Sequence, residues 1–255
     1  MTNNLKPEKI SDTLFIYQDK NVFSYGTDAV LLCAYAKTFI KKASFKKGID
    51  LCSGTGIIGL MLLDKTENFV CHAAEINKDA CEISKMSAEI SGLSDRYFIH
   101  NTDIRNFKDC FCAESFDYVF SNPPYMTDSC GFMCEKDYKN IARHEILCNI
   151  DDVFSAASFL LKTNSDIFTV YRHNRLSSLF AAAKKNSFEI KNMTFVYSKI
   201  TKPPVLVLCR AKKQASEGLI VSPPLIIHSH DGTYTDDMKY ITEKGEFPKS
   251  WQMKR

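Results

Sequence analysis

The sequence predicts an α/β protein with a doubly wound, Rossmann-like, mostly parallel sheet of seven strands and an antiparallel hairpin at one edge. From Phe45 onward, short apolar runs alternate with stretches of helical periodicity, which is typical of βαβ units. A glycine-bearing turn follows the first run. The last two runs are separated by Lys-Pro-Pro without a helical stretch, which favours antiparallel pairing. The expected strands are Gly48–Leu51, Phe69–Glu75, Tyr97–Asn101, Phe116–Ser121, Asp166–Tyr171, Phe195–Ser198 and Val205–Arg210.

Helices and flanking segments complete the expected organisation. Helices are expected at Ile57–Asp64 and Lys78–Ser91, the second ended by Gly92. Residues 28–42 (DAVLLCAYAKTFIKK) are expected to form an amphipathic helix capped by Thr27 or Asp28. After the core we expect a strand at Leu225–His228, a turn at Asp231–Gly232 and a loosely ordered tail. The chain thus divides into an N-terminal extension (1–44), a core (45–217) and a C-terminal extension (218–255).

Composition narrows the class of protein. The chain has 255 residues, 45% of them hydrophobic, and a net charge of only +3, so a basic patch is possible but is not implied. Its polar N-terminus has no apolar segment typical of a signal peptide, and no run reaches the roughly 20 residues that span a bilayer. We therefore expect a cytoplasmic protein with reduced thiols, monomeric by default. The ten cysteines lack zinc-site spacing, so no metal is expected.

The turn after the first strand carries the first chemical motif. Gly54, Gly56 and Gly59 fit G-x-G-x-x-G, a pattern that also describes dinucleotide sites. The preceding acid, Asp50, discriminates between the two cofactors. A carboxylate repels a pyrophosphate but attracts a sulfonium cofactor with a free amino group, so the motif favours S-adenosylmethionine (SAM). We expect that a Cβ at Gly54 or Gly56 would intrude on this cofactor.

Acids at the ends of the next two strands extend the expected cofactor site. Glu75 ends the second strand, where its two oxygens can accept both ribose hydroxyl groups. Asp103 follows the third strand and can accept the adenine amino group, with Ile104 or Ile76 against the ring face. Each acid is also compatible with an ordinary surface position at a strand end.

The run Asn122-Pro-Pro-Tyr125 is the most specific motif in the sequence. It follows the strand Phe116–Ser121, and its prolines hold the loop in an extended conformation. The side-chain carbonyl of Asn122 and the backbone carbonyl of Pro123 can accept the two N–H groups of a planar amino or carboxamide group. Pro124 stiffens the loop and Tyr125 can stack on the flat substrate. Methyl transfer to that nitrogen would then depend mainly on positioning and electrostatics.

Together these motifs resemble the class I SAM-dependent methyltransferases with an N-P-P-Y motif, over about residues 20–175. Within that class the chain resembles the bacterial tRNA1(Val) adenine-N6 methyltransferases, through Phe23-Ser-Tyr-Gly-Thr-Asp28, Ala142-Arg-His-Glu145 and Asp231-Gly-Thr-Tyr. The resemblance implies N6-methylation of adenosine 37, next to the anticodon, with S-adenosylhomocysteine as by-product. It also implies that the segment Tyr25, Gly26, Thr27 and Asp28 borders the methionine end of SAM. Cys52 and Thr55 complete the expected cofactor set, although Cys52-Ser53 falls where that subfamily varies.

Other substrates remain open. A release-factor glutamine presents the same two N–H groups to Asn122, but only about 45 residues precede the first strand, too few for the helical N-terminal domain of such enzymes. A DNA adenine methyltransferase would normally carry a target-recognition insertion, and the sequence has no such block. Other RNAs and small molecules are further alternative substrates. A non-enzymatic binding module would be expected to have a disrupted N-P-P-Y loop, and here the motif is intact. Basic residues near the expected site are candidates for RNA contact, and each is also compatible with a solvated surface charge: Lys136, Lys139, Arg143, His144, Arg172 and Arg175.

Overall fold

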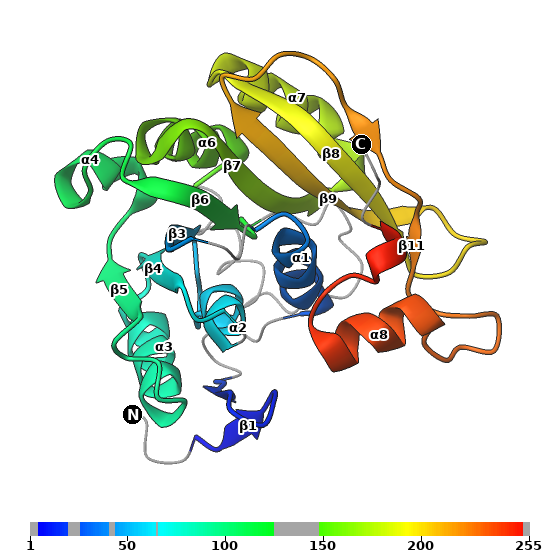
Figure 1. The fold of residues 1–255 in the computed structure, drawn as a ribbon, viewed down its shortest axis with the longest axis horizontal. Coiled ribbons are helices and arrows are strands. Elements are labelled where there is room, and N and C mark those ends of the chain that lie inside the picture. The colour runs from blue at the N-terminus through cyan, green and yellow to red at the C-terminus, as the bar shows by residue number, and fades with distance from the viewer. Residues whose placement is uncertain (1–4, 20–25, 41–43, 65, 125–147, 252–255) are drawn as a thin grey trace, which may run out of the picture.

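The computed structural model describes residues 5–19, 26–40, 44–64, 66–124 and 148–251. Its central sheet has the strand order β10-β8-β9-β7-β6-β3-β4-β5, with β11 beside β8 (Figure 1). The seven long strands confirm the expected architecture, and two-residue strands β10 and β11 extend its edge. The sheet strands are β3 (Lys46–Leu51), β4 (Phe69–Glu75), β5 (Tyr97–Asn101), β6 (Phe116–Ser121), β7 (Leu161–Arg172), β8 (Phe188–Tyr197), β9 (Pro204–Lys213), β10 (Ile220–Val221) and β11 (Leu225–Ile226).

Pairing directions confirm the predicted mixture of parallel and antiparallel strands. Strands β5, β4, β3, β6 and β7 are parallel, whereas β9 is antiparallel to both β7 and β8. Consequently β8 ends at the same edge as β3, β4, β6 and β7, and the β8–β9 loop lies at that edge too. The loops that follow these strands therefore gather at one edge, where ligands bind in open α/β sheets.

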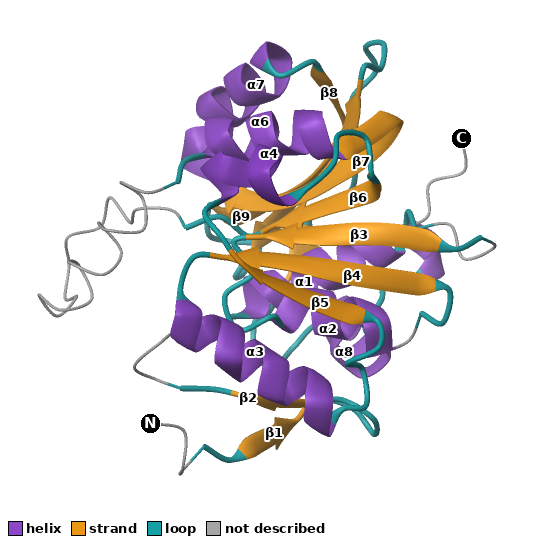
Figure 2. Cartoon of the chain, turned by 90° about the vertical axis from the view of Figure 1, so that its left-hand side faces the viewer, coloured by secondary structure: helices purple, strands orange, loops and turns teal. Residues whose placement is uncertain are grey.

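Helices cover both faces of the sheet (Figure 2). One face carries α4, α6 and α7, and the other carries α1, α2, α3 and α8. Side chains alternate between two cores: Tyr118 and Phe120 of β6 join one cluster, and Val119 between them joins the other. The helices are α1 (Thr27–Lys37), α2 (Ile57–Asp64), α3 (Lys78–Ile90), α4 (Phe107–Cys110), α6 (Ile150–Leu160), α7 (Leu176–Lys185) and α8 (Asp236–Lys244), with short 3-10 turns η1 (Ile104–Asn106), η2 (His173–Arg175) and η3 (Lys249–Trp251).

The N-terminal segment differs from the expectation in two respects. Helix α1 is not amphipathic, because residues 31–36 are all buried between the sheet, α2 and α8. Its N-cap is Gly26, which has no side chain to cap the helix, rather than Thr27 or Asp28. The helix ends at Lys37 rather than at residue 42. Before it, β1 (Pro7–Lys9) and β2 (Phe15–Tyr17) form a hairpin that packs against α3.

The C-terminal tail was expected to be loosely ordered, and over residues 236–244 that prediction was wrong. Thr235 accepts a hydrogen bond from the Met238 amide at the start of α8, and Gly245 ends the helix at φ +66°. The pair Met238 and Ile241, one turn apart, is buried against the core. None of the described helices is both long and apolar enough to cross a bilayer.

Candidate cofactor and methyl-transfer site

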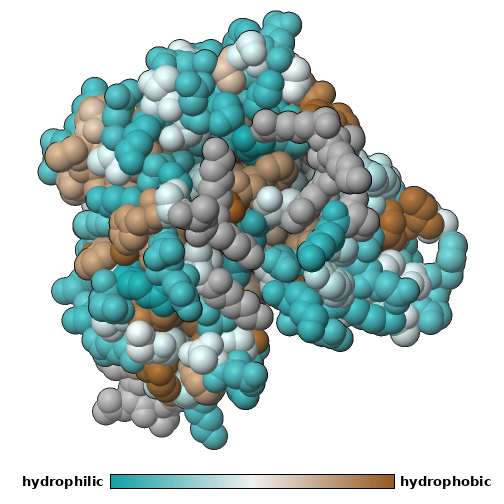
Figure 3. Space-filling view, in the orientation of Figure 1, coloured by the Kyte–Doolittle hydropathy of each residue, from teal (hydrophilic) through white to brown (hydrophobic). Residues whose placement is uncertain are grey.

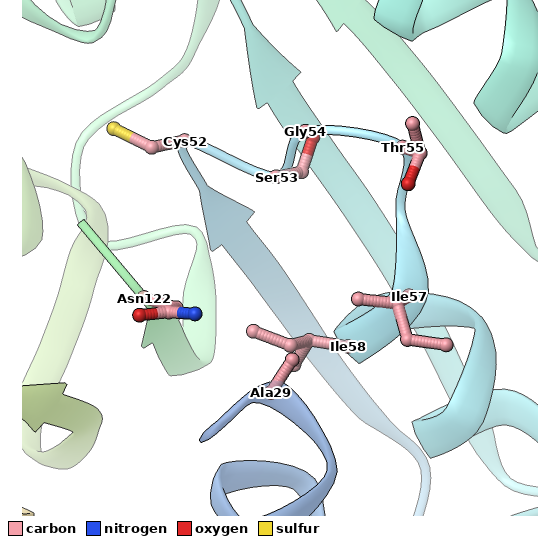
Figure 4. Close-up of a pocket in the computed structure, with 8 residues that line it drawn as sticks. All are labelled: Ala29, Cys52, Ser53, Gly54, Thr55, Ile57, Ile58 and Asn122. Atoms are coloured by element: carbon pink, nitrogen blue, oxygen red, sulfur yellow. The ribbon is translucent and has the colours of Figure 1, made fainter. Parts of the chain in front are cut away.

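A pocket lies at the carboxyl edge of the sheet, between the ends of β3 and β6 and the first turns of α1 and α2 (Figure 4). It is open to solvent, and the space within its outline, open solvent included, is about 340 Å³. The turn that follows β3 forms one side, and Asn122, at the end of β6, lies on the other. The residues that line the pocket are Ala29, Cys52, Ser53, Gly54, Thr55, Ile57, Ile58 and Asn122.

The backbone of the glycine turn lies partly in the left-handed region, which glycine adopts more readily than other residues. Gly54 and Gly56 have φ values of +55° and +85°, and Cys52 also lies in the left-handed region at +58°. A Cβ at Gly56 would come within 2.1 Å of the Ser84 hydroxyl and 2.4 Å of the Tyr97 hydroxyl. The sequence analysis expected a Cβ at Gly56 to intrude on the cofactor. In the structure it would instead collide with side chains of α3 and β5, and the positive φ also favours glycine here.

Glu75 ties the turn to the neighbouring strand. Its Oε2 accepts the Gly54 amide at 2.8 Å, and its Oε1 accepts the Asn77 amide at 2.8 Å. The side chain is almost fully buried at the end of β4. A carboxylate has about four acceptor sites, so capacity for ribose hydroxyl groups remains. The sequence indicated an acid at this position but gave no sign of its structural role.

Asp50 lies fully buried at the end of β3, under the start of α2. Neither of its carboxylate oxygens has a hydrogen-bond partner among the described residues. Burial raises the pKa of Asp50 well above its usual range, and the nearby Glu75 charge raises it further; the Gly59 amide, which lies nearby but outside hydrogen-bond geometry, lowers it in part. An unpartnered buried carboxyl group of this kind is stabilised by a cationic ligand.

Asn122 follows β6 directly, in register with the glycine turn. The Ser121 hydroxyl donates to the Leu51 carbonyl at 2.9 Å and so joins the ends of β6 and β3. Asn122 Oδ1 is buried without a hydrogen-bond partner among the described residues, and Pro123 is buried as well. An unpaired carbonyl at a pocket wall is poised to accept an N–H from a ligand.

The three residues expected around an adenine ring have different surroundings. Asp103 is engaged by Arg105, which donates both its backbone amide and its guanidinium, and this lowers the pKa of the Asp103 carboxyl. Ile104 is buried in the core, so it presents no free face, whereas Ile76 is 40% exposed beside Glu75. The geometry therefore favours Ile76 over Ile104 as the apolar contact.

The start of α1 lies at the pocket, although through a different residue from those expected. Ala29 lines it, while Thr27 is exposed and Asp28 half-buried in the same turn. Ser53, Ile57 and Ile58 are also lining residues that sequence reasoning missed. Their positions in and directly after the glycine motif were the available signal; nothing in the sequence singled out Ala29.

Several expected residues cannot be compared with this geometry. Tyr25, Tyr125, Lys136, Lys139, Arg143 and His144 lie outside the described residues. Arg172 and Arg175 are described: both are half-buried, at the end of β7 and in η2, and so lie at the same edge as Asn122.

The donors and acceptors around the pocket define its chemistry. Besides Asp50 and Asn122, the hydroxyl groups of Ser53 and Thr55 are buried without a partner among the described residues. These groups offer acceptors and rotatable hydroxyls but no fixed cation, which fits a ligand carrying an ammonium group and N–H donors. In the described parts of the chain, no three His, Cys, Asp or Glu side chains are grouped as metal ligands.

Comparison with known families agrees with this chemistry. The family described as methyltransferase small domain matches residues 13–138, a range that includes the glycine turn, Glu75 and Asn122. The chain is a methyltransferase.

Similar proteins extend beyond that domain. The tRNA1(Val) (adenine(37)-N6)-methyltransferase of Phocaeicola vulgatus is 28% identical to this methyltransferase over 229 residues, 90% of this chain and 93% of the relative. The protein of the same name from Serratia proteamaculans is 27% identical over 89% of this chain and 85% of its own length. The methyltransferase thus matches these relatives across nearly their whole length.

Solved structures share its fold at lower identity. A predicted O-methyltransferase from Agrobacterium tumefaciens superposes with a TM-score of 0.69 at 18% identity, over 87% of this chain and 98% of that chain. Geranyl diphosphate C-methyltransferase from Streptomyces coelicolor gives a TM-score of 0.53 at 11% identity, over 73% and 75%. These likenesses establish the fold of the methyltransferase, and its substrate must be argued from the site.

Proposed function

We propose that this methyltransferase transfers a methyl group from SAM to the N6 amino group of adenosine in tRNA, at adenosine 37 of tRNA1(Val). The observation that carries the proposal is Asn122, which lies across the pocket from the glycine turn and whose side-chain carbonyl is buried without a partner among the described residues. The names of the two similar relatives supply the RNA and the position. A tRNA substrate also supports the expected cytoplasmic localisation.

The residues around the glycine turn are proposed to bind the cofactor. SAM supplies an electrophilic methyl group on a sulfonium and carries a cationic amino group. Asp50 balances that positive charge from beneath the turn, while Ser53 and Thr55 provide hydrogen-bonding hydroxyl groups. Glu75 accepts the ribose hydroxyl groups through its remaining acceptor sites and holds Gly54 in place through its Oε2.

Asn122 and the loop after it are proposed to hold the substrate nitrogen. The exocyclic amino group of adenine is a poor nucleophile, because its lone pair is delocalised into the ring. Asn122 Oδ1 and the Pro123 carbonyl accept its two N–H groups, which orients the nitrogen toward the methyl group. This is catalysis by positioning and by preorganised acceptors. The target base must first leave its stack, and this costs least in a loop such as an anticodon arm.

The experiment that tests this proposal is a competition between acceptors. Purified protein is incubated with radiolabelled SAM, unmodified bulk tRNA and a release factor in the same tube. We expect label in the tRNA fraction, recovered as N6-methyladenosine in one valine tRNA. Label confined to the release factor would replace the proposal with glutamine methylation, because a carboxamide presents the same two N–H groups.

A further inference from the structure

A second polar surface lies at the same edge of the sheet as the pocket. Arg172 of β7 pairs with Leu206 of β9, and Pro204 of β9 pairs with Tyr197 of β8. The β8–β9 loop (198–203) is therefore reached from Asn122 by crossing β7 and β9. Three inter-strand spacings give about 14 Å across the sheet, and the four residues from Leu208, level with Asn122, to Pro204 add about 13 Å along the strands, so the base of the loop lies roughly 19 Å from Asn122. The loop is thus close enough for a polymer bound at Asn122 to reach it, but too far for the reacting base.

The C-terminal segment anchors this loop. The Ile227 amide donates to the Tyr197 carbonyl at 2.8 Å, and the His228 amide donates to the Ser198 carbonyl at 3.0 Å. The turn 228–234 then folds back, so that the Tyr234 ring lies 5.3 Å from the His228 ring. Figure 1 draws the β8–β9 loop beside β11. The result is a fixed platform on which Tyr234 remains 41% exposed.

The platform carries two lysines at the loop tip and one acid, Asp231, in the turn 228–234. Lys199 and Lys202 flank the loop tip, and neither is in an ion pair with any described residue. The nearby acids are engaged locally: Asp231 accepts the amide and hydroxyl of Thr233, Asp236 pairs with Lys239, and Asp237 accepts the Trp251 indole N–H. Hydrogen bonds from Thr233 do not neutralise the Asp231 carboxylate, so the positive charge is local to the loop tip, where Lys199 and Lys202 lie outside any ion pair with a described residue.

The tip also carries apolar area. Ile200 is 56% exposed between the two lysines. In Figure 3, the right-hand side of the molecule, where Figure 1 draws this loop and β11, shows hydrophilic atoms around a small apolar patch. Lysines alternating with an exposed aromatic ring and an aliphatic side chain suit a single-stranded polyanion with flat bases.

We propose that the hairpin-turn surface, formed by Lys199, Ile200, Lys202, His228 and Tyr234, binds the stretch of substrate RNA that flanks the target adenosine. Lys199 and Lys202 neutralise phosphates, and Tyr234 stacks with a base outside the pocket. This inference rests on the proposed RNA methylation and extends it, because it assigns binding of the polymer to a surface remote from the methyl-transfer site. Phosphate contacts fix the register of the RNA, while Asn122 acts on one base.

The test compares two double variants with the same change in charge. Lys199→Ala with Lys202→Ala removes two cations from the surface; Lys85→Ala with Lys184→Ala removes two exposed lysines from α3 and from the last turn of α7. We expect the first variant to raise KM for valine tRNA about 10-fold with kcat unchanged. The slope of log affinity against log salt should fall by roughly 1.5, since each phosphate contact contributes about 0.7–0.9. SAM affinity should be unchanged.

The aromatic residue is tested separately. Tyr234→Leu should weaken tRNA binding about 5-fold or more, and Tyr234→Phe should restore it, because stacking needs the ring and not the hydroxyl group. If wild type methylates tRNA and the Lys199/Lys202 variant behaves as the Lys85/Lys184 control does, the hairpin-turn surface is not the RNA site. If wild type neither binds nor methylates tRNA, the proposed function itself fails.

Discussion

At the scale of single residues, the site combines buried polar groups that lack partners with a turn held under constraint. Asp50 was identified from the sequence because its carboxylate discriminates between cofactor classes, and the structure adds its complete burial. The bond from Gly54 to Glu75 was not predictable, because it depends on the register of two strands whose acid and turn are separated by 21 residues. Motif spacing identifies such residues, but their hydrogen bonds follow from packing.

Asp50→Asn should stabilise the protein without cofactor while weakening SAM binding. The unfolded carboxyl group titrates near pH 3.8, whereas burial raises the pKa in the fold. Between those values only the folded state holds the proton, so the free energy of unfolding falls as pH rises above about 4. The asparagine side chain does not titrate, so the variant does not lose stability in this way. Urea unfolding should therefore show an advantage of the variant that grows with pH, and calorimetry should show SAM binding weakened about 10-fold. Exposed Asp109→Asn is the matched control. A constant difference in unfolding free energy across pH would contradict this account.

Cys52 provides a test of strain in the turn. Its φ of +58° costs a residue with a Cβ roughly 1–2 kcal/mol, and glycine avoids most of this cost. Cys52→Gly should therefore be more stable than Cys52→Ala by about 1 kcal/mol, although both lose the contact with Cys148 Sγ at 3.7 Å. Urea denaturation of the two variants measures the difference. An alanine variant at least as stable as the glycine variant would mean that the turn relaxes.

At the scale of elements, the sequence predicted the helices and strands whose own residues carry a clear periodicity or turn signal. Alternation and turn residues predicted the parallel strands, and α2 begins and ends at the predicted residues. Helix α6 was missed, although Asn149 and Asp152 form a capping box that marks its start. Helix α8 was missed because its apolar face has only Met238 and Ile241, too few for a periodic signal. Helix α1 was predicted to be amphipathic, but it is buried on all sides, which the sequence periodicity did not indicate.

The histidine pair across β4 and β5 makes the fold sensitive to acid. His72 Nδ1 lies 2.8 Å from His100 Nε2, and burial, Lys47 and His100 lower the pKa of His72 to about 3. Burial and Lys47 lower that of His100 as well. Between about pH 6.5 and 3, unfolded His72 binds a proton that folded His72 does not. The contribution to stability is therefore complete above about 6.5 and is lost as pH falls.

Replacing the pair should remove part of that sensitivity. His72→Gln with His100→Gln is expected to show a smaller loss of unfolding free energy between pH 7.5 and 5 than wild type. Exposed His230→Gln serves as the control and should retain the wild-type dependence. Urea titrations at the two pH values measure this difference. An unchanged pH dependence in the double variant would show that other groups control acid stability.

At the scale of the whole molecule, the fold was predictable because its sheet follows from chain order and crossover rules. The substrate is less predictable, because proteins of this fold act on different molecules and the Asn122 motif suits any planar nitrogen with two N–H groups. The division at residues 44/45 and 217/218 stays a prediction. So do the roles of the residues that bind cofactor and RNA, which the variants above are designed to test.

The most direct test of the central claim is a comparison of wild type with Asn122→Ala in single-turnover methylation of unmodified valine tRNA. Nucleosides are analysed by mass spectrometry, and SAM affinity is measured on the same preparations. We predict N6-methyladenosine at one position with wild type. For the variant we predict SAM affinity within about 2-fold of wild type and a methylation rate reduced about 100-fold or more, the usual cost of losing one preorganised contact to the reacting group. Loss of SAM binding together with turnover would make Asn122 a structural residue, and absence of N6-methyladenosine with wild type would contradict the proposed reaction.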